Sequence, residues 1–155
     1  MKSKISSQPG RIIPILVLTN IALLFLTSCS NIRLVSDYDD ITDKKVTELQ
    51  DKFARHFVKL ERAIGTSEAD YSHFIEFYDA AKSELRTLRV RANAIDKNTI
   101  VTEQLDLLEK NVSDLEELHK MGFSTTAEII PLKSAFELSF TAIIKFQMGL
   151  KRGKG

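Results

Sequence analysis

The segment YSHFIEFYDAAKSELRTLRVRANAI, residues 71–95, carries the most regular pattern in the chain. Its apolar positions recur at intervals of three and four residues: Tyr71, Phe74, Tyr78, Ala81, Leu85, Leu88, Ala92 and Ile95. This alternation places all of these side chains on one face of an α-helix. Ser67, followed three residues later by Asp70, is typical of a capping box at a helix start. The pattern predicts an amphipathic helix that begins at Ser67 and buries one stripe.

Two more segments carry the same kind of stripe. The first helix is expected to begin between Asp37 and Asp43, where acidic side chains can cap it, and to end at Gly65. Its apolar positions are Val46, Leu49, Phe53, Phe57, Leu60 and Ile64. A later helix is expected to end at Gly122, with apolar positions Val101, Leu105, Leu108, Val112, Leu115 and Leu118. Each segment predicts one helix with one buried face.

A fourth striped segment starts around Thr125 or Thr126 and crosses Pro131. Its stripe consists of Leu132, Phe136, Phe140, Ile143, Gln147 and Leu150. Because proline is tolerated only within the first turn of a helix, we expect a short turn at residues 125–129 and the main helix from about residue 130.

Four such segments joined by short turns favour antiparallel neighbours. No stretch alternates for long with the period of two that is typical of strands. We therefore expect an all-α fold, an antiparallel up-down-up-down four-helix bundle. A three-helix bundle with the fourth helix lying across it is the alternative.

The N-terminal residues have a different character. Lys2, Lys4 and Arg11 precede an almost entirely apolar run, Ile12–Leu26, and no acidic residue occurs before Asp37. A helix of that length reaches only ~22 Å, which is short of the ~30 Å of hydrocarbon that a membrane-spanning helix crosses. A charged start, an apolar centre and a small-residue exit instead predict an export signal.

Leu26-Thr27-Ser28-Cys29 ends this run with the only cysteine of the chain. The segment resembles the signal peptide and lipobox of bacterial lipoproteins. The resemblance implies cleavage between Ser28 and Cys29, with lipid on the sulfur of Cys29. The expected organisation is a signal peptide at residues 1–28, the lipidated cysteine and a tether at 29–37, the helical bundle at 38–151 and a basic tail at 152–155. Ser30 also resembles the sorting pattern for the outer membrane of Gram-negative bacteria.

A second resemblance covers most of the remaining chain. Tyr38-Asp39, Leu49-Gln50, Lys59-Leu60-Glu61, Gln104-Leu105-Asp106 and the Pro131–Phe136 segment are similar to small uncharacterised helical lipoproteins of Gram-negative bacteria. This resemblance implies a helical fold and an envelope location, and it implies no activity.

Charge and cysteine content argue against two properties, general nucleic-acid binding and stabilisation by a disulfide. Without the three cations of residues 1–28, the formal net charge of +1 becomes −2, which argues against a general nucleic-acid binder. A lipidated Cys29 would leave no thiol for a disulfide, so packing alone must stabilise the domain.

Basic residues gather where the predicted topology places the membrane. The first helix starts at the tether, so the second helix would end, the third begin and the fourth end near the bilayer. Anionic lipid would attract cations there. The candidates are Arg86, Arg89, Arg91, Lys97, Lys151 and Arg152. Alternatively these cations complement helix dipoles, or Lys82, Arg86 and Arg89 pair with Glu103, Asp106 and Glu109.

Glu116 and His119 form a Glu-x-x-His pair, the short motif that four-helix di-iron proteins place on two helices. Asp70 and His73 form a degenerate counterpart. The first and fourth helices offer no matching inward Glu, so we interpret the histidines as surface or boundary residues and expect no metal or other cofactor. No nucleophile elbow, phosphate loop or His-Glu-x-x-His motif is present. We therefore expect no enzymatic activity.

The sequence thus predicts a membrane-anchored envelope lipoprotein, held by lipid on Cys29 and facing the periplasm from the outer membrane. It would act as a non-enzymatic binding or accessory protein, with an envelope protein or a second copy as partner. Ile75, Phe77 and Phe146 widen the apolar stripes, and they either close a larger core or line a groove for a partner helix or an apolar ligand. The alternative function is a small-ligand or metal carrier that uses the bundle interior.

Overall fold

The computed structural model describes residues 34–153, and the compact unit begins at Val35. The predicted signal peptide, the cleavage site, Cys29 and the first part of the tether lie outside the described residues, as do the last two residues of the tail. Among the described helices none is long and apolar enough to cross a membrane.

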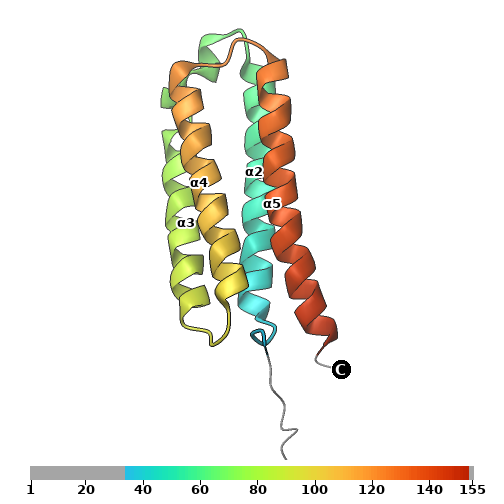
Figure 1. Ribbon diagram of the computed structural model, residues 1–155. Helices are drawn as coiled ribbons and strands as arrows, with labels where there is room; N and C mark the ends of the chain where they lie inside the picture. Colours follow the sequence, from blue (N-terminus) through green and yellow to red (C-terminus); the bar gives the residue numbers. More distant parts are fainter. Residues whose placement is uncertain (1–33, 154–155) are drawn as a thin grey trace, which may run out of the picture. The chain divides into compact units, whose positions relative to one another are not determined.

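Four long helices form the fold, and no strand occurs within residues 34–153. They are α2 (Asp40–Ala63), α3 (Ile75–Asn93), α4 (Thr99–Met121) and α5 (Thr126–Arg152). Two short 3-10 turns, η2 (Ser67–Ala69) and η3 (Tyr71–His73), connect α2 to α3. Figure 1 shows the helices running side by side with short connections at their ends. Because α5 packs along both α2 and α4, the predicted four-helix bundle is confirmed.

The predicted stripes form the core of this bundle. On α2, Val46, Leu49 and Leu60 are completely buried, and α4 buries Val101, Leu108 and Val112 to the same degree. Phe53 of α2 stacks on Phe136 of α5, with ring centroids 4.7 Å apart. Phe77 and Phe146, which widen the stripes, pack against this core, whereas Ile75 is 41% exposed. Phe77 and Phe146 therefore enlarge the core.

Helix α2 begins within the predicted interval. The carboxylate of Asp39 caps it by accepting hydrogen bonds from the backbone N–H of Thr42 at 3.2 Å and the Thr42 hydroxyl at 2.5 Å. The helix ends before Gly65, whose φ of +82° is a left-handed conformation that favours glycine. The local signals at both ends of this helix were sufficient to locate it.

The predicted start of the second helix at Ser67 is wrong, because α3 begins only at Ile75. The backbone of Asp70 is extended, with φ −63° and ψ 139°, and this conformation interrupts a helical ladder. The side chain of Thr66, not Ser67, caps the first 3-10 turn by accepting from the N–H of Glu68. The segment Thr66–Phe74 is therefore a separate connection, which crosses the end of the bundle where α2 stops.

The prediction that the main fourth helix starts at about residue 130 is also wrong. Helix α5 is continuous from Thr126, and Pro131 lies inside it. Ile129 is completely buried, so the first turn is anchored to the core. Ala127 and Pro131 are both exposed, and water can reach the carbonyl that the proline ring leaves without a donor. Packing outweighs the missing hydrogen bond.

Three segments meet where the chain joins the bundle, and we call this the proximal end. The N–H of Ser36 donates to the carbonyl of Lys97 at 3.0 Å, and the Ser36 hydroxyl donates to Oδ1 of Asn98 at 2.8 Å. Gln147 near the end of α5 accepts from the N–H of Asp39 at 3.4 Å. Thus the start of α2, the α3–α4 loop and the end of α5 lie together, as the predicted topology requires (Figure 1).

Candidate functional site

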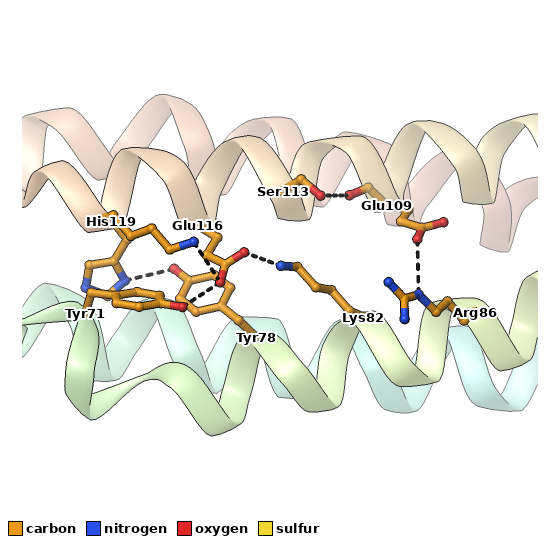
Figure 2. A network of polar contacts seen from close by, with 9 residues as sticks. Tyr71, Tyr78, Lys82, Arg86, Glu109, Ser113, Glu116 and His119 are labelled. Carbon is orange, nitrogen blue, oxygen red and sulfur yellow. Dashed lines mark hydrogen bonds and ion pairs between the residues drawn. The ribbon is translucent and has the colours of Figure 1, made fainter.

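A buried carboxylate lies between α3 and α4 near the opposite, distal end of the bundle. Glu116 of α4 is only 6% exposed. Its carboxylate accepts a hydrogen bond from the Tyr71 hydroxyl at 2.6 Å, and it pairs with Lys82 of α3 and, at 3.3 Å, with Lys120. Figure 2 shows these side chains converging from η3, α3 and α4. The carboxylate is therefore fully engaged by protein groups.

These contacts determine the charge states of Glu116 and Tyr71. Burial by itself would raise the pKa of Glu116, but the hydrogen bonds from Lys82, Tyr71 and Lys120 outweigh it and lower that pKa to about 2. The hydrogen bond to this carboxylate is the main cause that raises the pKa of Tyr71 to about 12. Neither group would exchange protons near neutral pH. The arrangement suits a structural link and not an acid–base pair.

One helical turn further, His119 connects three elements through its ring. Its Nε2 lies 2.8 Å from the carbonyl oxygen of Ala69, and its Nδ1 lies 2.8 Å from the Tyr78 hydroxyl. Because a carbonyl can only accept, Nε2 carries the proton and Nδ1 accepts from the Tyr78 hydroxyl. Burial lowers the pKa of His119, and burial likewise raises the pKa of Tyr78. The imidazole is neutral and both ring nitrogens are used.

A second buried histidine, His56 of α2, lies close to His119. Its ring stacks on Phe77 with centroids 3.8 Å apart, and Phe74 and Tyr78 contact it edge-on. It is 4% exposed, and its Nε2 has no hydrogen-bond partner. Burial lowers the pKa of His56 to about 3, assisted by the neighbouring His119 and Lys59. His56 is therefore a neutral imidazole within an aromatic cluster.

The interpretation of the histidines as surface or boundary residues is wrong for two of the three, since His56 and His119 are buried and only His73 is exposed. Glu116 and His119 are neighbours, but they bond to separate partners. Within residues 34–153, no three His, Cys, Asp or Glu side chains are placed to hold a metal ion. Asp70 and His73, on the 3-10 connection, are both exposed.

The basic candidates are placed in two groups. Arg89 pairs with Asp106 at 2.7 Å and Glu109 at 3.6 Å, and Arg86 lies 3.8 Å from Glu109. These are the inter-helix pairs of the alternative interpretation, although Lys82 bonds to Glu116 and not to that group.

The other basic candidates lie at the proximal end. Arg91 forms a bidentate pair with Asp39, with N–O distances of 2.5 and 2.6 Å. The Lys97 carbonyl holds Ser36, and Nζ of Lys151 lies 5.4 Å from the centroid of the Tyr38 ring. Arg152 is exposed. Their contact with lipid stays a prediction.

A surface groove of about 640 Å³ runs between α2 and α3 toward the proximal end. Leu88 forms its buried floor, and the exposed Ile41 and Val90 border it. The cations on its rim are already paired, Lys52 with Glu84 and Arg91 with Asp39. The groove is mainly apolar, and the described residues do not indicate what covers it.

Sequence reasoning missed the polar partners of the half-buried Tyr71 and the fully buried Tyr78. Tyr71 and Tyr78 occupy stripe positions, and a buried phenol usually requires a hydrogen-bond partner. That rule could have indicated that the Glu116 and His119 side chains point inward. It could not have identified Ala69 as the acceptor of His119, because the two residues are 50 positions apart and nothing local connects them.

Comparisons of this chain with protein-family models, with curated proteins and with solved structures found no match.

Proposed function

We propose that the protein is a bacterial envelope lipoprotein, anchored by lipid on Cys29, that acts as a non-enzymatic binding or accessory protein on the periplasmic side of the outer membrane. The observation that carries the proposal is the attachment of Ser36 to Lys97 and Asn98. It leaves only seven residues, 29–35, before the bundle, and these span at most ~25 Å when extended. A lipid on Cys29 would hold the proximal end close to the bilayer.

A binding role is supported by the state of the polar groups. The Glu116 carboxylate and both ring nitrogens of His119 form hydrogen bonds or ion pairs with other groups of the protein. Catalysis requires a reactive group that substrate can reach, and these groups serve instead to join η2, η3 and α3 to α4.

The carrier alternative receives no comparable support. A crevice of about 70 Å³ lies between α2 and α5 beside Phe53 and Phe136, with the exposed Ala54 and Glu137 on its rim. Ligand pockets in proteins commonly have volumes of ~300–1,000 Å³. The proposal therefore places binding on the outer surface of the bundle.

The proposed membrane contact falls mainly on the end of α5. Arg86, Arg89 and Arg91 are engaged by carboxylates of the protein, which reduces what they offer to lipid. Lys151 and Arg152 are exposed at the proximal end, and each cation near an anionic surface contributes ~1 kcal/mol.

The decisive test of the anchor is the Cys29→Ser variant in a bacterial host supplied with a labelled fatty acid. We expect the variant to lose the label and either to leave the membrane fraction or to remain unprocessed. The matched control is Ser30→Ala, which should keep both the label and the membrane location. Unchanged labelling and fractionation of Cys29→Ser would refute the proposed anchor.

The accessory role is tested with the native lipidated protein, crosslinked briefly, purified in mild detergent and analysed by mass spectrometry. A recurrent envelope partner with crosslinks on the helix surfaces is the expected result. Recovery of the protein alone would contradict an accessory role.

A further inference from the structure

The connection Thr66–Phe74 depends on α4 for its attachment. Its internal hydrogen bonds are those of two 3-10 turns, such as that from the N–H of Phe74 to the Tyr71 carbonyl at 2.9 Å, and that of the Thr66 cap. Two side-chain bonds hold it on α4: His119 Nε2–H donates to the Ala69 carbonyl, and the Tyr71 hydroxyl donates to Glu116. We call this segment the flap.

The flap covers two histidines that lie together. The ring centroids of His56 and His119 are 6.3 Å apart, and the two residues are 4% and 1% exposed. Phe74, the last residue of the flap, contacts both rings. Lifting this one segment would therefore uncover one side of both imidazoles without separating the four helices, while Phe77 and Tyr78 of α3 stay packed on His56.

His56 has no means to accommodate a charge while it is covered. Its Nε2 has no partner even in the neutral ring, and its ring is surrounded by Phe57, Phe74, Phe77 and Tyr78. Protonation would add a charge and a further N–H donor to an apolar cluster, where an unpaired charged group is very costly. Hydration of the ring removes this cost.

The charged groups around the pair do not compensate. From α2, Lys59 lies over the Phe74 ring and opposes a cation on His56. From α4, the charge of Glu116 is already matched by Lys82 of α3 and by Lys120. From the flap, the hydrogen bond to the Ala69 carbonyl and, to a smaller extent, the exposed Asp70 favour a cation on His119, but burial outweighs both. From α5, Phe136 packs one layer away on Phe57, and Lys133 pairs with Glu61.

We propose that Thr66–Phe74 is an acid-released flap: His56 and His119 bind protons preferentially in an open state, in which the flap has left α4 and the distal end of the bundle is open while the helices stay together. At neutral pH both rings are neutral, His119 donates to Ala69, and the flap is closed. Once the flap lifts, both rings reach water and bind protons.

The direction of the pH effect follows from linkage. Burial lowers the pKa of both histidines in the closed protein below the ordinary value of 6.5, so the open state binds more protons. The open state therefore gains population as the pH falls below about 6.5, by up to about tenfold per pH unit for each histidine. The carboxylates of Asp39 and Glu116, whose pKa values are about 2, do not titrate in this range.

The test is hydrogen exchange of the whole protein at pH 7, 6 and 5, with each rate corrected for the intrinsic pH dependence of exchange. We expect protection of the amides of Ala69, Asp70, His73 and Phe74 to fall at least about tenfold from pH 7 to pH 5. Phe136–Ile143 of α5 should stay better protected than the flap at each pH, because these amides exchange only when the helices separate. Flap amides as strongly protected as those of α5 at pH 5, or no loss of protection in the flap, would overturn the proposal.

His56→Phe is the informative variant, because it keeps an aromatic ring in the cluster and removes one titrating group. We expect it to reduce the pH dependence of flap exchange by up to about tenfold per pH unit. His73→Gln is the matched control, since His73 is an exposed histidine of the flap itself, and its profile should equal that of the unmodified protein. If flap exchange depended on pH equally in the unmodified protein, His56→Phe and His73→Gln, His56 would have no part in the release of the flap.

An NMR titration of the imidazoles in the unmodified protein keeps the test independent of whether the variants fold. The proposal requires His56 and His119 to bind protons together with the loss of flap protection. Titration of both rings near 6.5 with a fully protected flap would contradict it.

Discussion

Tyr78 is completely buried in the first turn of α3, with its hydroxyl directed to His119. Replacing it by Phe leaves the Nδ1 atom of a buried histidine without a donor. We expect Tyr78→Phe to lower the free energy of unfolding by about 1–3 kcal/mol, measured by urea unfolding at pH 7.5. The control is Tyr38→Phe. The Tyr38 hydroxyl donates to Asp43 at a position where water can replace it, so this variant should lose much less unfolding free energy. Similar losses for the two variants would show that burial does not set the cost.

Asp39 combines two roles that a matched pair of substitutions can separate. Asparagine also caps helices well, so Asp39→Asn should keep the cap and lose the ion pair with Arg91, whereas Asp39→Ala loses both. We expect losses of about 1–2 kcal/mol for Asn and about 1 kcal/mol more for Ala in urea unfolding at pH 7. Equal stability of the Asn variant and the unmodified protein would mean that the ion pair contributes nothing.

The sign of the pH dependence at this residue is also defined. The hydrogen bond from Arg91 is the largest cause that lowers the pKa of Asp39 to about 2. The stabilisation is therefore present above about pH 4 and is lost as the pH falls toward 2. In urea titrations, the difference in unfolding free energy between Asp39→Asn and the unmodified protein should become smaller as the pH falls from 4 toward 2. A constant difference would contradict the lowered pKa of Asp39.

At the scale of the element, α5 carries a proline at its sixth residue, where the ring removes a hydrogen bond to the Ala127 carbonyl. An interior Pro costs a helix ~3 kcal/mol relative to Ala, and the rigidity that proline gives the unfolded chain offsets part of this. We expect Pro131→Ala to raise the free energy of unfolding by about 1–2 kcal/mol, read from the urea midpoint. Ser134→Ala, an exposed change on the same helix, should stay within about 0.5 kcal/mol. A destabilised Pro131→Ala would show that the proline shapes the native turn.

The elements also show what a single sequence can reveal. The stripes of α2 and α4 were predictable because each apolar position depends only on its own helix period, and the cap at Asp39 is a local signal. The flap was not predictable: the capping-box pattern at Ser67 and Asp70 competes with bonds from Tyr71 and Ala69 to residues 45 and 50 positions away on α4. The continuity of α5 across Pro131 depends likewise on the burial of Ile129 by other helices.

For the candidate site, the periodicity predicted which tyrosines lie in the stripe but not the histidine they meet. Glu116 and His119 were recognised as a pair with a possible shared ligand, and the structure gives each its own protein partners instead. The burial of His56 had no signal in the pattern, because position 56 falls beside the stripe residue Phe57 and its ring is covered by Phe74, Phe77 and Tyr78 of the segments that follow α2.

For the whole molecule, the two buried histidines should make global stability sensitive to mild acid. Both have a lowered pKa in the folded state, so the unfolded chain takes up more protons below about pH 6.5 and stability falls with pH. We expect a loss on the order of 2–4 kcal/mol between pH 7 and 5, measured by urea unfolding followed by circular dichroism. The His56→Phe variant should lose less. Stability that does not change over this range would contradict the neutral assignment of both rings.

The attachment of Ser36 to the α3–α4 loop has a mechanical consequence. When a bundle is tethered at its proximal end by a segment shorter than the bundle itself, its two ends lie at different distances from the attachment point. Helix α2 alone is 24 residues, or about 36 Å, long, and the flap lies beyond its far end. With lipid on Cys29, the proximal end would face the bilayer and the distal end would face the aqueous compartment. The histidines would then sample the acidity of the compartment and not that of the lipid surface.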